Sequence, residues 1–210
     1  MAKIGFIGLG IMGAHMARNL IKGGHSLFVS GTHPVPEDLG KATTVIADST
    51  AVAQAADIVV IMVPDTPDVA NVLFADDGVA KGLTAGTLVI DMSSISPLDT
   101  QAFAKTVNEL GCDYLDAPVS GGEVGARDAT LTIMVGGPEK AFERALPLLE
   151  LMGKNISLIG DNGAGQTCKA YWFSAALQQP KPPNHSRTGV QHWRGWRRSM
   201  ASWFFHFAAW

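Results

Sequence analysis

The chain alternates short, almost wholly apolar runs with longer stretches of mixed polarity. The clearest run is Ile58-Val59-Val60-Ile61-Met62-Val63, which has no polar position at all. Strands that are buried on both faces of a parallel sheet have this continuous apolar pattern. The runs predict strands at Lys3–Gly8, Ser26–Ser30, Thr43–Ile46, Asp57–Val63, Thr87–Asp91, Asp113–Ala117, Leu131–Val135 and Ile156–Ile159.

The stretches between these runs carry signals for the start and end of helices. Asp48-Ser49-Thr50 precedes an alanine-rich helix, and Ser96-Pro97 opens another that ends at Gly111. Pro138 begins a third predicted helix, Glu139–Met152. Serine, threonine and aspartate cap helix N-termini, proline suits the first turn, and glycine ends helices. Repeated alternation of strand and helix predicts an α/β fold with a doubly wound, mostly parallel sheet.

The first predicted strand runs directly into the glycine-rich segment Gly8-Leu9-Gly10-Ile11-Met12-Gly13, and a helix-like stretch, Ala14–Lys22, follows. In this order Gly8 permits a tight turn, Gly10 lets a phosphate approach the backbone, and Gly13 allows close packing of helix on strand. The helix N-terminus adds free N–H groups that attract an anion. An ordinary βα turn has similar glycines, but the strand–turn–helix context favours a Rossmann-type cradle for NAD or NADP.

The end of the second predicted strand leaves the choice between NAD and NADP open. An acidic residue at that point would bind the ribose 2′-hydroxyl of NAD. The stretch is Val29-Ser30-Gly31-Thr32-His33, which has neither an acid nor an arginine. Ser30 or Thr32 could serve either cofactor, and His33 favours a 2′-phosphate only weakly.

Two further loops follow predicted strands at the edge where ligands of a doubly wound sheet collect. Val63-Pro64 comes after the fourth strand, and Ser93-Ser94 comes after the fifth. We expect Val63, Pro64, Ser93 and Ser94 to contact the cofactor. The alternative is plain loop chemistry, in which Ser96-Pro97 simply begins the next helix.

Two candidate groups for substrate chemistry lie later in the chain. Ser120 and the N–H groups of Gly121 and Gly122 could hold a carboxylate, although the glycines could also serve a tight turn that needs positive φ. Lys169 follows Gly163-Ala164-Gly165 at the start of another predicted helix. A lone lysine is usually a solvated surface charge.

Composition changes this picture mainly at the C-terminal end. The chain has 210 residues, a hydrophobic fraction of 47% and a net charge of −3, which suits one globular domain with a core. Its two cysteines, Cys112 and Cys168, form neither a disulfide framework nor a zinc pattern. We expect no metal, no leader ahead of Lys3, no run of the roughly 18 residues needed to cross a membrane, and a cytoplasmic location.

Residues 171–210 have a different composition from the rest. They contain all five tryptophans and none of the 19 acidic residues, and Pro180-Lys181-Pro182-Pro183 interrupts any helix. We expect this tail to be poorly ordered. A translated shift of the reading frame would give such a composition. A basic, aromatic patch for nucleic acid is the alternative, but no predicted element supports it.

Taken together, the motifs resemble the β-hydroxyacid dehydrogenases, which include 3-hydroxyisobutyrate dehydrogenase. The resemblance rests on the order and spacing of Gly8-x-Gly10-x-x-Gly13, Asp91-Met92-Ser93-Ser94, Asp116-Ala117-Pro118-Val119-Ser120-Gly121-Gly122 and Gly165-x-x-x-Lys169, and covers about residues 1–170. It implies an oxidoreductase that uses NAD or NADP on a small-molecule substrate. In such enzymes the serine and glycines matching Ser120, Gly121 and Gly122 anchor the substrate carboxylate, and the lysine matching Lys169 is the general acid/base.

The chain also departs from that family's pattern. The family places an asparagine three positions after the lysine, where this chain has Trp172 after Tyr171. The resemblance implies a cofactor domain over 1–163, the start of an interdomain helix over 164–170, and then a helical domain that helps to form homo-oligomers. Residues 171–210 do not resemble that domain, so a non-catalytic NAD(P)-binding module stays open as an alternative.

Overall fold

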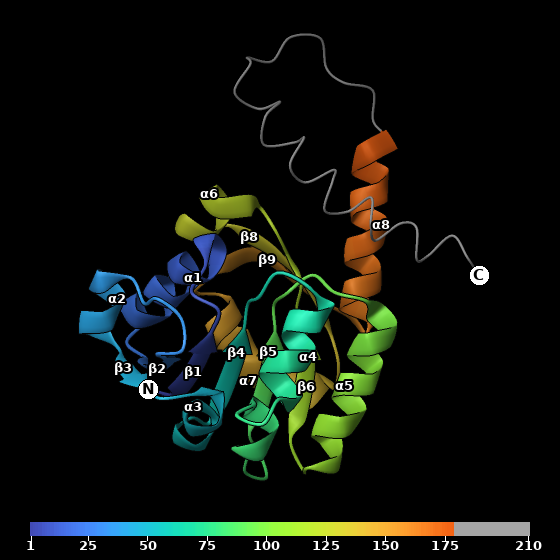
Figure 1. The fold of residues 1–210 in the computed structure, drawn as a ribbon. Helices are drawn as coiled ribbons and strands as arrows, with labels where there is room; N and C mark the ends of the chain where they lie inside the picture. The colour runs from blue at the N-terminus through green and yellow to red at the C-terminus, as the bar shows by residue number, and fades with distance from the viewer. Residues whose placement is uncertain (179–210) are drawn as a thin grey trace. The chain divides into compact units, whose positions relative to one another are not determined.

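The structure, a computed structural model, describes residues 1–178 (Figure 1). Residues Met1–Phe173 form one compact unit, and a second unit begins at Ser174. The strands are β1 (Lys3–Ile7), β2 (Ser26–Ser30), β3 (Thr44–Ile46), β4 (Ile58–Ile61), β5 (Leu88–Asp91), β6 (Asp113–Asp116), β7 (Val119–Ser120), β8 (Leu131–Gly136) and β9 (Gly153–Gly160). The helices are α1 (Ile11–Lys22), α2 (Glu37–Ala42), α3 (Ser49–Ala55), α4 (Thr66–Phe74), the 3₁₀ turn η1 (Val79–Lys81), α5 (Pro97–Glu109), α6 (Gly122–Arg127), α7 (Glu139–Leu149) and α8 (Ala164–Gln178).

The strands form one sheet in the order β3-β2-β1-β4-β5-β6-β8-β7, with β9 paired to β8. Pairing from β3 through to β6 is parallel, whereas β8 runs antiparallel to β6 and β7. The chain leaves β1 toward β2 on one side and returns to β4 on the other. The carboxyl ends of β1 and β4 therefore form the crevice in which doubly wound sheets bind their ligands. The predicted doubly wound, mostly parallel α/β fold is confirmed.

Two hydrophobic layers cover the sheet, and consecutive residues of one strand face opposite layers. In β4, Ile58 and Val60 pack with α1, α2, α6 and α7, whereas Val59 and Ile61 pack with α3, α4 and α5. Burial on both faces explains why this strand is a continuous apolar run. None of the helices among the described residues is long and apolar enough to cross a membrane.

Caps at the helix N-termini match the sequence signals. The Asp48 carboxylate accepts the Ala51 N–H at 2.8 Å at the start of α3, and the Ser96 hydroxyl accepts the Asp99 N–H at 3.3 Å ahead of Pro97 in α5. Asp65 caps α4 in the same way, through the Thr66 N–H at 2.7 Å. These caps fix where each helix leaves the ligand-binding edge of the sheet.

Several boundaries differ from the sequence-based prediction. The glycine segment supplies the first turn of α1, which begins at Ile11 and not at Ala14. The helix predicted to reach Met152 ends at Leu149. The last strand begins at Gly153, ahead of the predicted Ile156, and the missing Cβ of Gly153 allows its close approach to the Leu131 carbonyl oxygen. The elements α2, α4, η1, β7 and α6 were not individually predicted. For β7 and α6 the reason is that two residues and a glycine-rich turn carry no periodic signal.

The expected tail falls in two parts. Residues 171–178 belong to α8, which runs without interruption from Ala164 to Gln178. The remainder of the expected tail, residues 179–210, lies outside the described residues.

Candidate active site at the carboxyl edge of the sheet

The glycine segment forms a close-packed turn with one open position. Gly8 has φ +97°, and a Cβ on it would overlap the Met62 carbonyl oxygen. A Cβ on Gly13 would overlap the Gly8 carbonyl oxygen. A Cβ on Gly10, by contrast, would meet no protein atom within 4 Å. Gly8 and Gly13 are therefore needed by the fold, whereas the space over Gly10 is free for a group that approaches the backbone.

This geometry fits a dinucleotide pyrophosphate. Gly10 is the N-cap of α1, so the first N–H groups of the helix are directed toward the open space. Leu9 and Met12 are half-buried against the core, and Ile11 is exposed beside the opening. Cofactor contacts from the backbone of Leu9, Ile11 and Met12 stay predictions.

The loops after β4 and β5 are tied together beside this turn. The Val63 N–H donates to the Ser93 hydroxyl at 3.1 Å, and the Ser93 N–H donates to Asp91 Oδ1 at 2.9 Å. Ser93 is fully buried, whereas Pro64 is exposed and Val63 and Ser94 are partly exposed. The Ser93 side chain thus holds the two loops in register, and Val63, Pro64 and Ser94 present the accessible surface that was predicted to meet the cofactor.

The end of β2 presents hydroxyl groups that bond to one another. Ser30 Oγ lies 2.8 Å from Thr32 Oγ1, and Thr32 Oγ1 lies 3.2 Å from His33 Nδ1. The Thr32 N–H also donates to Ser30 Oγ at 3.2 Å, and all three hydrogen bonds are exposed to solvent. The hydroxyls can therefore rearrange toward either a ribose hydroxyl or a 2′-phosphate.

A buried acidic pair, which the sequence did not reveal, lies beneath the site. Asp91 and Asp116 end the neighbouring strands β5 and β6, and both are fully buried. Burial raises the pKa of Asp91 to about 6, although hydrogen bonds from Ser93 and Tyr114 act in the opposite direction. The Tyr114 hydroxyl donates to Asp91 Oδ2 at 2.9 Å. Burial also raises the pKa of Asp116, although the Gly163 and Gln166 N–H groups bond to its carboxylate.

The predicted substrate segment lies on β7 and the start of α6. Ser120 pairs with Thr132 of β8, and the chain then turns through Gly121 and Gly122, which have φ of +137° and +62°. Both glycines are exposed, and a Cβ on Gly122 would meet nothing within 4 Å. The glycines thus serve the turn, and they also leave accessible N–H groups beside the Ser120 hydroxyl.

Lys169 lies against this same segment. Its Nζ donates to the carbonyl oxygen of Val119, the residue before Ser120, at 2.8 Å. Removal from water lowers the pKa of Lys169. The structure therefore brings together Lys169 and Ser120, which the sequence separates by almost fifty positions, and Lys169 is not a freely solvated surface charge.

A contact between α1 and α6 joins the glycine cradle to the substrate segment. Asn19 is buried on α1 and donates to the Ala126 carbonyl oxygen of α6 at 2.8 Å, and His15 lies 3.7 Å from Glu123 on the same face. Sequence reasoning missed Asn19. A signal was available, since Asn19 is a polar residue on a helix face shared with the buried Met16 and Leu20.

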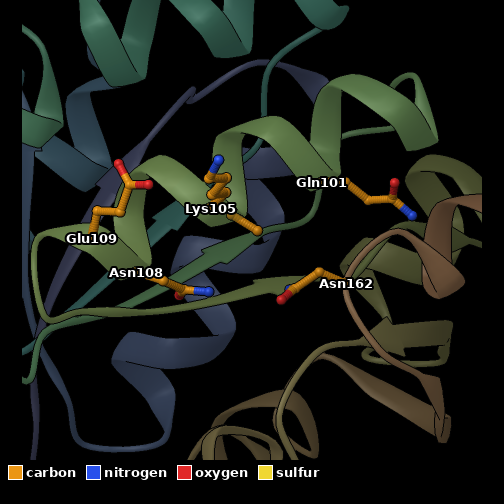
Figure 2. Close-up of a pocket in the computed structure, with 6 residues that line it drawn as sticks. Gln101, Lys105, Asn108, Glu109 and Asn162 are labelled. Carbon is orange, nitrogen blue, oxygen red and sulfur yellow. The ribbon is translucent and has the colours of Figure 1, made fainter.

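Other features lie apart from this cluster. A surface hollow of about 430 Å³ is lined by α5 residues with Asn162 opposite them, and it contains none of the predicted site residues (Figure 2). Trp172, one helical turn beyond Lys169, is 58% exposed. Within residues 1–178, no three His, Cys, Asp or Glu side chains are grouped so that they could hold a metal.

Residues 3–160 match the family model described as the NAD binding domain of 6-phosphogluconate dehydrogenase. The chain belongs to this family. Its cofactor is a nicotinamide dinucleotide, NAD or NADP, in agreement with the open Gly10 cradle.

Individual relatives share the same part of the chain. It is 58% identical over 168 residues to 2-hydroxy-3-oxopropionate reductase of Escherichia coli K12, covering 80% of this chain and 58% of that enzyme. The structure of Mycobacterium tuberculosis 3-hydroxyisobutyrate dehydrogenase with L-serine is similar, with a TM-score of 0.76, 37% identity, and coverage of 84% of this chain and 60% of that one. Psf3, solved with NADP⁺ and 2-OPP, has a TM-score of 0.76 and 28% identity over 82% of this chain and 62% of that one. The chain thus spans about three fifths of the length of these relatives.

Proposed function

We propose that the chain belongs to a reductase that converts tartronate semialdehyde (2-hydroxy-3-oxopropanoate) to D-glycerate with NADH or NADPH. The observation that carries the proposal is the 2.8 Å bond from Lys169 Nζ to the Val119 carbonyl oxygen, which holds an ammonium group beside Ser120. The 58% identity to 2-hydroxy-3-oxopropionate reductase supports the choice of substrate. In this proposal residues 1–163 are the cofactor domain, and 164–170 begin the helix that leads out of it.

Reduction of the aldehyde requires a hydride donor, a proton donor and groups that bind the substrate carboxylate. The bound nicotinamide cofactor supplies the hydride to the aldehyde carbon. The Ser120 hydroxyl and the N–H groups of Gly121 and Gly122 bind the carboxylate, and Lys169 donates a proton to the carbonyl oxygen as negative charge develops there. One hydride and one proton added to the aldehyde give the primary alcohol of D-glycerate, so the reaction balances.

The surroundings of Lys169 suit a proton donor at neutral pH. Its lowered pKa brings the ammonium group closer to the range in which it can both give and regain a proton. Its Val119 partner is a neutral carbonyl, and among residues 1–178 no ion pair with an acidic side chain holds the proton in place. We further propose that the enzyme acts on this small molecule in the cytoplasm.

Steady-state oxidation of NADH and NADPH with tartronate semialdehyde tests the proposal. Wild type, Lys169→Ala and the control Lys154→Ala, an exposed lysine on β9, are compared. We expect Lys169→Ala to lower kcat by roughly 100-fold or more and Lys154→Ala to leave it unchanged. Turnover that persists undiminished in Lys169→Ala would remove Lys169 from its role.

A second substrate is favoured by the similarity to the M. tuberculosis 3-hydroxyisobutyrate dehydrogenase. The two substrates differ in the group next to the carboxylate, so kcat/KM for 3-hydroxyisobutyrate oxidation and for tartronate semialdehyde reduction separates the two enzymes. Binding of NADH or NADPH without turnover of either substrate would instead favour the non-catalytic module.

A further inference from the structure

Helix α8 carries Lys169 on its second turn, and the first turn of this helix is fixed to β6 by a buried carboxylate. Asp116 accepts the Gly163 N–H at 2.8 Å and the Gln166 N–H at 3.0 Å, one on each oxygen. Gly165 lies between these two residues, and a Cβ on it would come within 2.8 Å of Asp116 Oδ2. The helix therefore begins in tight contact with the carboxyl end of a central strand, with a negative group at its N-terminus.

The Gln166 side chain makes a second attachment, to the opposite part of the site. It is 2% exposed, its Nε2 donates to the Ser93 carbonyl oxygen at 2.8 Å, and its Oε1 accepts the Ile95 N–H at 3.1 Å. Both partners belong to the loop between β5 and α5, which also carries Ser94. One amide thus satisfies a buried acceptor and a buried donor together, a pairing that neither a carboxylate nor an apolar side chain reproduces.

Lys169 follows Gln166 by three positions, so both side chains leave the same side of the helix on successive turns. Gln166 contacts the loop predicted to meet the cofactor, and Lys169 contacts the Val119 carbonyl beside the predicted substrate segment. A rotation or shift of this turn would move the ammonium group relative to both surfaces. Because the lysine side chain is long and flexible, its position depends on where the helix holds its Cα.

We propose that Gln166 is a positioning residue for Lys169: its amide locks the first turn of α8 to the Ser93–Ile95 loop and so fixes the ammonium group beside Val119 and Ser120. The catalytic consequence rests on the proposed function, whereas the placement of Lys169 does not. The expected kinetic signature is a fall in kcat, since proton transfer depends on geometry, with little change in KM for NADH.

The placement is tested without turnover by the pH dependence of Lys169 acetylation with acetic anhydride, followed by peptide mass spectrometry. The unmodified chain is compared with Gln166→Ala and with Gln54→Ala, an exposed glutamine on α3. In Gln166→Ala we expect the midpoint pH for labelling of Lys169 to shift upward toward that of a solvated lysine, because the released ammonium group gains water. Above that midpoint, where the amine is neutral in both proteins, the more accessible Lys169 of the variant should label faster. Gln54→Ala should label as wild type, and Lys154 serves as the internal reference in every sample.

An unchanged labelling profile of Lys169 in folded Gln166→Ala would overturn the proposal. If Gln166→Ala does not fold, Gln166→Glu keeps the volume and replaces it in the same comparison. At low pH a protonated glutamate offers one donor and one acceptor, so kcat should approach wild type there and fall as the glutamate ionises. A Gln166→Glu profile parallel to wild type at every pH would equally refute the positioning role.

The kinetic arm separates this inference from the proposed function. We expect Gln166→Ala to lower kcat by roughly 10- to 100-fold. If Lys169→Ala abolishes turnover while Gln166→Ala changes neither kcat nor labelling, the positioning role fails alone. If Lys169→Ala leaves turnover intact but Gln166→Ala alters the labelling, the proposed function fails and the placement stands.

Discussion

Replacement of Gly10 by alanine should remove cofactor binding while leaving the fold intact. A Cβ on Gly10 meets no protein atom within 4 Å, and the backbone at φ −69° and ψ −166° is open to alanine. Loss of the glycine N-cap should therefore cost about 1 kcal/mol of folding free energy at most. The same methyl group would occupy the space predicted for the pyrophosphate, and even 1.4 kcal/mol of lost interaction raises Kd tenfold.

Two other glycines provide matched comparisons. Gly13→Ala places a Cβ onto the Gly8 carbonyl oxygen, so it should lower the free energy of unfolding by about 1–3 kcal/mol through the forced backbone shift. Gly40→Ala, on an exposed face of α2, should leave binding unchanged and raise stability by roughly 0.5–1 kcal/mol.

The assays are NADH and NADPH titration by nicotinamide fluorescence, and urea unfolding of each variant. The expected pattern is weak binding with near-normal stability for Gly10→Ala alone. A Kd for Gly10→Ala within twofold of wild type would show that the cofactor does not pass over Gly10.

Three further changes test other parts of the site. Ser30→Asp puts a carboxylate at the end of β2, where it can accept a hydrogen bond from a ribose 2′-hydroxyl and repel a 2′-phosphate. The ratio of the Kd for NADPH to the Kd for NADH should therefore rise roughly tenfold or more. An unchanged ratio would place the ribose elsewhere. Tyr114→Phe leaves Asp91 Oδ2 without its buried donor and should lower the free energy of unfolding by about 1–3 kcal/mol in urea titrations, and equal stability of the two proteins would contradict the bond. The pKa of Asp91 rises from 3.8 to about 6 on folding, so its contribution to stability is fully present below pH 4 and is lost as pH rises through 6. Urea titrations at several pH values should find this change of about 3 kcal/mol in wild type and not in Asp91→Asn. Parallel pH curves for the two proteins would argue against a buried Asp91.

Features set by nearby residues were predictable from the sequence, whereas those set by distant partners were not. The Gly8–Gly13 cradle combines a strand, a turn and a helix that are adjacent in the chain, so spacing alone predicted it. Asn19 donates to Ala126, 107 positions away, and Gln166 bonds to Ser93, 73 positions away. Such pairs meet only when the sheet order is known.

The acidic residues illustrate the same limit. The sequence placed Asp91 and Asp116 within the family-like motifs but gave neither a role, because Asp91 simply ends one predicted strand and Asp116 lies one residue before the end of another. Parallel pairing of β5 with β6 sets them opposite each other, and the packing above them removes water. The raised pKa of Asp91 is therefore a property of the sheet order and not of its local sequence.

Isotope transfer from the cofactor to the substrate tests the proposed reduction. The chain is incubated with tartronate semialdehyde and NADH that carries deuterium at C4 of the nicotinamide, and the product is examined by mass spectrometry, which detects even very slow turnover. We expect D-glycerate with one deuterium at C3 from wild type and from Lys154→Ala, and none from Lys169→Ala. A chain that binds NADH yet yields no deuterated D-glycerate would contradict the proposed reduction.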